Sequence, residues 1–224
     1  MTTLVQLNTM VANIVQDFTY DGDEITSILN QAVQEIAGGM VSAFEGKYDI
    51  ISPLPDLFST ADVTTSLSES YISMPATYQR NMQFAVNATN QELDIYNSMI
   101  QFTKNYPTTA GAGAVNALIQ QGDNLHYRNR PAAAETLTLS FYRLPVDMAA
   151  DSDTPDGIPA QLQVPLLVNF ACWELFKRIE NGLEGPLVNT DRYHALFLEA
   201  LRALETFIPV VTDRYRIRRV FSYK

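Results

Sequence analysis

The sequence of 224 residues has 46% apolar residues and a net charge of −10 at pH 7, the proportions of a globular protein with a sizeable core. Its single cysteine, Cys172, excludes a disulfide within one chain, and no apolar run approaches the ~18 residues that a membrane-spanning helix requires. Because the N-terminus also lacks the basic and apolar regions of a signal peptide, we expect a soluble protein that folds inside the cell.

The charge is distributed unevenly along the chain. Residues 211–224 carry five basic residues against one acid, which leaves a net charge of −14 on residues 1–210. Proteins bind duplex DNA largely by neutralising its phosphates with lysine and arginine, so the acidic part of the chain is unsuited to wrapping DNA. Such a surface suits a channel that DNA slides past without sticking.

Two helices are predicted in residues 1–39. The first, near residues 3–17, has one apolar side made of Leu4, Leu7, Met10, Val11, Ile14, Val15 and Phe18. The second begins at Asp21, where Glu24 completes a capping-box-like pattern, and ends at Gly38-Gly39. Its apolar stripe consists of Ile25, Ile28, Leu29, Ala32, Val33 and Ile36. Because the connection is short, we expect an antiparallel helical hairpin.

Residues 40–158 are predicted to form a β-rich insertion, because the apolar period falls to two and turn-forming residues become frequent. Short strands are expected at residues 71–72, 82–86 and 93–95, with a turn at residues 87–90. Ser98 is expected to cap a short helix that ends at Tyr106-Pro107. The strands near residues 115–119, 125–127 and 136–142 are predicted to form an antiparallel meander, with a hairpin turn at residues 121–124 and Pro145 ending the last strand.

The chain returns to helical periodicity after an acidic loop at residues 151–157. One helix is predicted near residues 164–180, with a continuous apolar stripe that includes Cys172. Another is predicted near residues 191–208, capped by Asn189 or Thr190 and ended by Pro209. Its stripe consists of Tyr193, Leu196, Phe197, Ala200, Leu201, Leu204, Phe207 and Ile208.

These elements predict an α+β fold. Residues 1–39 and 159–210 are expected to pack together as a four-helix bundle-like core, from which the antiparallel β-rich insertion, residues 40–158, projects. Residues 211–224 are expected to form an extended basic and aromatic C-terminal tail.

No residue pattern in the chain predicts a catalytic, metal or cofactor site. His126 and His194 have no cysteine or histidine at metal-binding spacing around them. Residues 151–157, DSDTPDG, resemble a calcium-binding loop, but Pro155 and Leu162 occupy positions where the pattern requires a ligand. The glycines near residue 111 lack the Gly-Lys-Ser/Thr sequence of a phosphate-binding loop. We therefore expect no enzyme activity and no cofactor.

The C-terminal tail is predicted to bind a partner. Its basic residues alternate with aromatic and β-branched ones, a composition that disordered tails seldom have and that favours strand addition or docking in a groove. The residues expected to make this contact are Arg214, Tyr215, Arg216, Ile217, Arg218, Arg219, Phe221 and Tyr223.

The order of segments resembles the head-to-tail adaptor (connector) proteins of tailed bacteriophages, especially short-tailed ones. The resemblance covers most of the chain: TLVQLNTMVANIVQD with DGDEITSILNQAVQEIA, then SYISMPATYQR, LDIYNSMIQFTKNYP, and GDNLHYRNRPAAAETLTLSFYRLP followed by DTPDGIP. No single one of these motifs is specific to the family, whereas their order is.

The resemblance implies a structural protein of the virion neck, assembled in the host cytoplasm and without catalytic residues. It implies a ring, commonly of twelve copies, that binds the portal protein above and tail nozzle or fibre proteins below, with genomic DNA passing through its lumen and no membrane contact. The C-terminal tail would then dock on the portal. Loops such as Met40–Phe58 and Tyr106–Gly113 would face the tail proteins.

Three alternatives remain at this point. The first is a tail-completion or nozzle-type protein, lower in the tail than an adaptor. The second is a virion-associated peptidoglycan hydrolase, because 25 acidic residues make some carboxylate pair almost inevitable. The third is an acidic cytosolic protein-binding module unrelated to phage.

Overall fold

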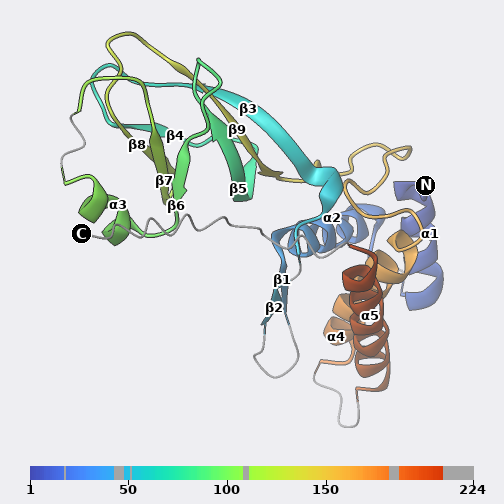
Figure 1. Cartoon of the computed structure of the whole chain (residues 1–224). Coiled ribbons are helices and arrows are strands. Elements are labelled where there is room, and N and C mark those ends of the chain that lie inside the picture. Colours follow the sequence, from blue (N-terminus) through green and yellow to red (C-terminus); the bar gives the residue numbers. More distant parts are fainter. Residues whose placement is uncertain (18, 43–47, 51, 108–110, 182–186, 209–224) are drawn as a thin grey trace.

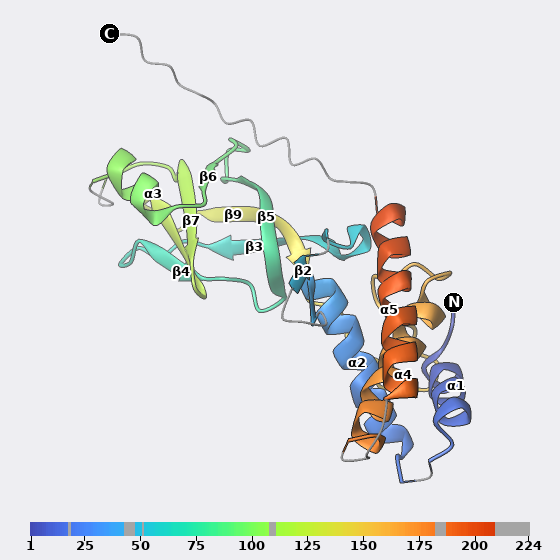
Figure 2. The ribbon, with the colours of Figure 1, turned by 90° about the horizontal axis from the view of Figure 1, so that it is seen from below.

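The computed structural model describes residues 1–17, 19–42, 48–50, 52–107, 111–181 and 187–208. Helices α1 (Leu4–Val15), α2 (Gly22–Gly38), α4 (Asn169–Ile179) and α5 (Val188–Phe207) form a helical lobe at one end of the molecule. Strands β3 to β9 and the short helix α3 (Met99–Asn105) form a β lobe at the other end, as both views show (Figure 1 and Figure 2). Sequences distant along the chain therefore meet within the helical lobe, and the predicted α+β class is confirmed.

The β lobe contains two stacked sheets. One has the order β3-β9-β5, with β3 at Phe58–Thr64, β9 at Thr136–Arg143 and β5 at Tyr78–Val86. The other has the order β4-β8-β7-β6, from β4 (Tyr71–Ser73), β8 (Asn124–Arg128), β7 (Ala117–Gln121) and β6 (Asp94–Tyr96). One buried apolar cluster draws on both sheets, including Ala85, Leu118, Tyr127 and Leu139. A separate hairpin pairs β1 (Met40–Ser42) with β2 (Tyr48–Ile50).

Two predictions about strand pairing were wrong. Strand β9 does not continue the β7–β8 hairpin as a meander; it is the central strand of the other sheet, between β3 and β5. Ser140, Phe141 and Tyr142 are all buried, so β9 is covered on both faces, which is typical of a central strand. The insertion is also not purely antiparallel, because β6 pairs with β7 in parallel. Helix α3 lies in the connection that a parallel pair requires.

The helical lobe is organised around α4, which packs against α1, α2 and α5. All four helices contribute to one buried core, which also includes Leu54, Leu57, Met148 and Ile158 from the connecting segments. Because α2 and α5 cross steeply in Figure 1, a regular four-helix bundle is not confirmed. A π-helical turn, Val164–Val168, precedes α4. The side chain of Asn169, the first residue of α4, donates to the Pro165 carbonyl of this turn at 2.7 Å.

Local start and stop signals were mostly predicted correctly. Asp21 accepts a hydrogen bond from the Glu24 backbone at 2.9 Å, and Gly39 ends α2 with a φ of 72° that favours glycine. The predicted caps of α5 were wrong, since α5 begins at Val188 and places Asn189 and Thr190 inside its first turn. Ser98 precedes α3 without a capping hydrogen bond from its side chain.

The apolar stripes predicted for α1 and α5 were too wide. All six residues of the α2 stripe are buried. Met10 and Ile14 of α1, in contrast, remain 39% and 37% exposed, and Leu196 and Phe207 of α5 remain 37% and 54% exposed. These residues lie beside the core-facing sides of their helices, so periodicity alone assigned them to the core. No helix in the described part of the chain is both long and apolar enough to cross a membrane.

Candidate functional site

The predicted partner-binding residues, from Arg214 to Tyr223, lie outside the described residues. The structure describes the chain as far as Ile208, which follows α5 and is buried in the helical core. The two loops expected to face tail proteins are described only in part, since residues 43–47, 51 and 108–110 also lie outside. The predicted docking segment therefore stays a prediction.

The cysteine and the two histidines, which were weighed as possible chemical groups, are packed against neighbouring side chains of the fold. Cys172 is fully buried in α4, and burial raises the pKa of its thiol to about 12. His194 is buried with its ring 4.5 Å from the Trp173 ring, and burial lowers its pKa. His126 lies in β8, against Tyr71 of the neighbouring strand. Within the described ranges, no three His, Cys, Asp or Glu side chains are grouped so that they could hold a metal ion.

A small cavity of about 160 Å³ lies among β5, β6 and β7. It is lined by Tyr78, Asn81, Met82, Ile95, Tyr96, Asn97 and Gln120. The Tyr78 hydroxyl donates to the Gln120 side-chain oxygen at 2.5 Å. The volume is below the roughly 300 Å³ of small-molecule sites, and the titratable side chains of the lining are the phenols of Tyr78 and Tyr96.

The acidic loop at residues 151–157 is a structural connector. Asp153 accepts hydrogen bonds at 2.8 Å from the backbone N–H groups of both Ala149 and Ala150. The carbonyls of Asp151 and Asp153 accept from the first N–H groups of α1, those of Val5 and Leu4. The loop thus satisfies donors that a helix start leaves free. The hydrogen bonds to Asp153 lower the pKa of its carboxyl.

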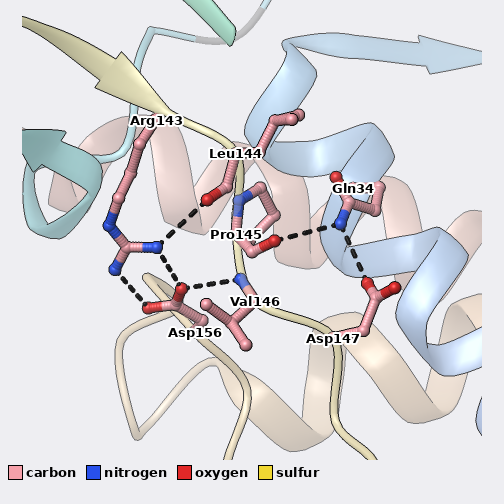
Figure 3. A network of polar contacts seen from close by, with 7 residues as sticks. All are labelled: Gln34, Arg143, Leu144, Pro145, Val146, Asp147 and Asp156. Carbon is pink, nitrogen blue, oxygen red and sulfur yellow. Dashed lines mark hydrogen bonds and ion pairs between the residues drawn. The ribbon is translucent and has the colours of Figure 1, made fainter. Parts of the chain in front are cut away.

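The best-defined polar network lies where β9 enters the helical lobe (Figure 3). Arg143, the last residue of β9, makes a two-pronged ion pair with Asp156, with N–O distances of 2.6 and 3.0 Å. Arg143 also donates to the Leu144 carbonyl, and Asp156 accepts from the Val146 N–H at 2.9 Å. Burial disfavours the charge on Asp156, but these hydrogen bonds outweigh it and lower the pKa of the carboxyl.

Helix α2 holds the other side of the same segment. The Gln34 side chain donates to the Pro145 carbonyl at 3.2 Å and to the Asp147 carboxylate at 2.9 Å, as Figure 3 shows. One turn earlier, the Asn30 amide exchanges two hydrogen bonds with the Met148 backbone, both at 2.9 Å. We call residues 143–148, together with Asn30, Gln34 and Asp156, the lobe junction.

The lobe junction was not predicted from the sequence. Pro145 indicated only that β9 ends there, and the partners of the segment lie more than one hundred residues away in α2. The amides Asn30 and Gln34, four residues apart on one helix side, were the available signal. Chemically, the network is a clamp: the charges of Arg143 and Asp156 are paired with each other, and the Asp147 carboxylate accepts a hydrogen bond from the neutral Gln34 amide.

Comparison with known families gives one match. The model of the family described as SU10 adaptor protein matches residues 2–220, nearly the whole chain. A comparison with curated proteins gave no match. The family match extends through both lobes and into the C-terminal tail, and it confirms the resemblance to phage adaptors seen in the sequence. The chain belongs to the SU10 adaptor protein family.

Proposed function

We propose that this protein is a head-to-tail adaptor that forms a ring, extends the portal channel and connects the portal to tail proteins. The observation that carries the proposal is the family match over residues 2–220. Adaptors of this family are structural phage proteins, which supports a place in the virion neck and does not favour the hydrolase alternative. Twelve copies is the number that the resemblance to connector proteins implies.

The charge of the chain supports passage of DNA through the proposed ring. Residues 1–210 carry a net charge of −14. On the helical lobe, exposed acidic residues include Asp21, Asp23, Asp191, Glu199 and Glu205. Negative side chains along a lumen would repel the phosphate backbone and let DNA move without binding.

The proposal divides the work among four segments. Residues 1–39 and 159–210 form the body of each copy, and strands β3 to β9 of the insertion, residues 40–158, project as the β lobe. Loops such as Met40–Phe58 and Tyr106–Gly113 would be directed at nozzle or fibre proteins. Residues 211–224 dock on the portal. Many copies of a weak tail contact would act together, because the ring holds all tails at a high effective concentration.

The proposal is tested by mixing the purified full chain, and separately a chain ending at Pro209, with portal rings of the same phage. We expect the full chain to form rings on the portal, and the shortened chain to lose most of its portal binding. Mass measurement and electron microscopy report the copy number. A full chain that ignores the portal would refute the portal assignment, and equal binding by both chains would refute the role of the tail.

A further inference from the structure

Helix α1 is unusual in carrying no charged residue over Leu4–Val15, although 18% of the chain is charged. Eight of its twelve residues are apolar, yet only Leu4, Leu7 and Val11 are buried. Charged residues are depleted at the centres of protein interfaces. An uncharged helix with surplus apolar residues on an acidic protein therefore indicates a surface that another molecule covers.

Two exposed apolar residues of α1, Met10 and Ile14, share one flank, whereas the exposed Val5 lies on another side of the helix together with Ala12. Met10 and Ile14 lie one turn apart and are more than one-third exposed. On the opposite side of the helix, the Asn8 side chain donates to the Thr26 hydroxyl of α2 at 3.0 Å. The α1 flank, Met10 with Ile14, is therefore turned away from α2. Its position is fixed by the backbone bonds between the start of α1 and the acidic loop.

Helix α5 presents a second exposed apolar surface. Leu196, Ala203 and Phe207 are exposed and spaced by seven and four residues, which places them on one side of the helix. We call these three residues the α5 face. The exposed charged residues Arg192 and Glu199, one positive and one negative, lie next to it. An apolar centre with a charged rim is the usual anatomy of a protein interface.

We propose that the α1 flank of one copy packs against the α5 face of the next copy in the ring; this inference rests on the proposed function. A ring with identical contacts needs two different surfaces on each copy, joined head to tail, and α1 and α5 are different helices that both pack on α4. The partner is a second copy because each chain of the proposed ring has identical neighbours. Chains that each carry a charge of −10 repel one another least across α1, which has no charged residue.

Disulfide trapping in the assembled ring tests the contact. Met10→Cys and Ala203→Cys are combined in one chain, and the natural Cys172 does not interfere because it is fully buried. Under mild oxidation on portal rings, we expect the double variant to give a ladder of covalent oligomers. Each single variant should give none, and an equal mixture of the two single variants should stop at dimers, because each chain then offers one thiol.

A charge substitution provides a matched second measurement. Met10→Glu should abolish ring formation, whereas Ala12→Glu, on the other side of the same helix and also exposed, should leave rings intact. Dimers from Met10→Cys alone would show α1 against α1 and overturn the inference. Wild-type rings in which the double variant gives no ladder would also overturn it while leaving the adaptor role standing. A wild-type chain that never assembles, alone or on the portal, would overturn both.

Discussion

Replacing Arg143 by methionine tests whether the lobe junction holds the two lobes together. The change keeps the aliphatic stem but leaves Asp156 with only the Val146 N–H as a donor among its junction partners. Removing one partner costs about 3–5 kcal/mol in a fully buried ion pair and about 0–1 kcal/mol in an exposed one. The two side chains are 26% and 23% exposed, so we expect a loss of about 2 kcal/mol in the free energy of unfolding.

Urea unfolding followed by tryptophan fluorescence measures this loss. The chain has a single tryptophan, Trp173, which is 8% exposed in α4 and therefore reports on the helical lobe. Arg178→Met is the matched control, because Arg178 pairs with Glu24 at 2.5 Å with side chains 45% and 39% exposed. Solvent screens that pair, so the control should lose no more than about 0.5 kcal/mol.

The effect of Arg143→Met should depend on pH in a defined direction. The pKa of Asp156 is lower in the folded state than the ordinary value of 3.8. A carboxyl of this kind stabilises the fold fully above its unfolded pKa, and this contribution is lost as the pH falls through the folded pKa. The stability gap between wild type and Arg143→Met should therefore be full at pH 7 and should narrow below about pH 4.

A double-mutant cycle with Asp156→Asn decides whether the two side chains act as a pair. We expect a coupling free energy above about 1 kcal/mol, since the groups share two hydrogen bonds. A coupling near zero, a loss no greater than that of Arg178→Met, or a gap that does not change with pH would each refute the claim that this ion pair fastens the junction.

Two further predictions concern other buried contacts. Tyr127→Phe should lower the free energy of unfolding of the β lobe by about 1–3 kcal/mol, because the Tyr127 hydroxyl bonds the Ser66 backbone and the Glu69 carbonyl. Near-UV circular dichroism in urea measures this loss, and an unchanged free energy would contradict the prediction. Glu180→Gln should speed hydrogen exchange in the first turn of α5, because the Glu180 carboxylate accepts from the Asn189 and Thr190 N–H groups at 3.1 and 3.0 Å. Unchanged exchange at those two amides would show that Glu180 does not cap the helix.

Elements with strong local signals were predicted from the sequence, and those that depend on distant pairing were not. Helix α2 has a cap, a complete stripe and a glycine stop, and all of these were found. Strand β3 was missed because its exposed residues, such as Thr60 and Asp62, alternate with small or weakly apolar ones. Its place beside β9 is fixed by pairing across more than seventy residues, as between Ala61 and Leu139, which no local pattern encodes.

The candidate interfaces follow the same division. The C-terminal tail could be predicted as a partner-binding segment because its charge and aromatic content are local properties of residues 211–224, and its role stays a prediction. The lobe junction was not, because an amide such as Gln34 does not reveal which backbone it will hold. Loop Asp151–Gly157 was weighed as a calcium site, whereas Asp153 and Asp156 are engaged by backbone N–H groups and by Arg143.

The overpredicted stripes of α1 and α5 carry information of their own. A hydrophobic sequence pattern marks every residue that is buried in the functional state, whether the same chain or another chain buries it. In α2 the pattern and the buried set coincide, whereas in α1 and α5 the pattern is wider by residues such as Met10 and Leu196. For a chain proposed to act only in a ring, this surplus is what assembly would require, because each copy must leave uncovered the side chains that its neighbours bury.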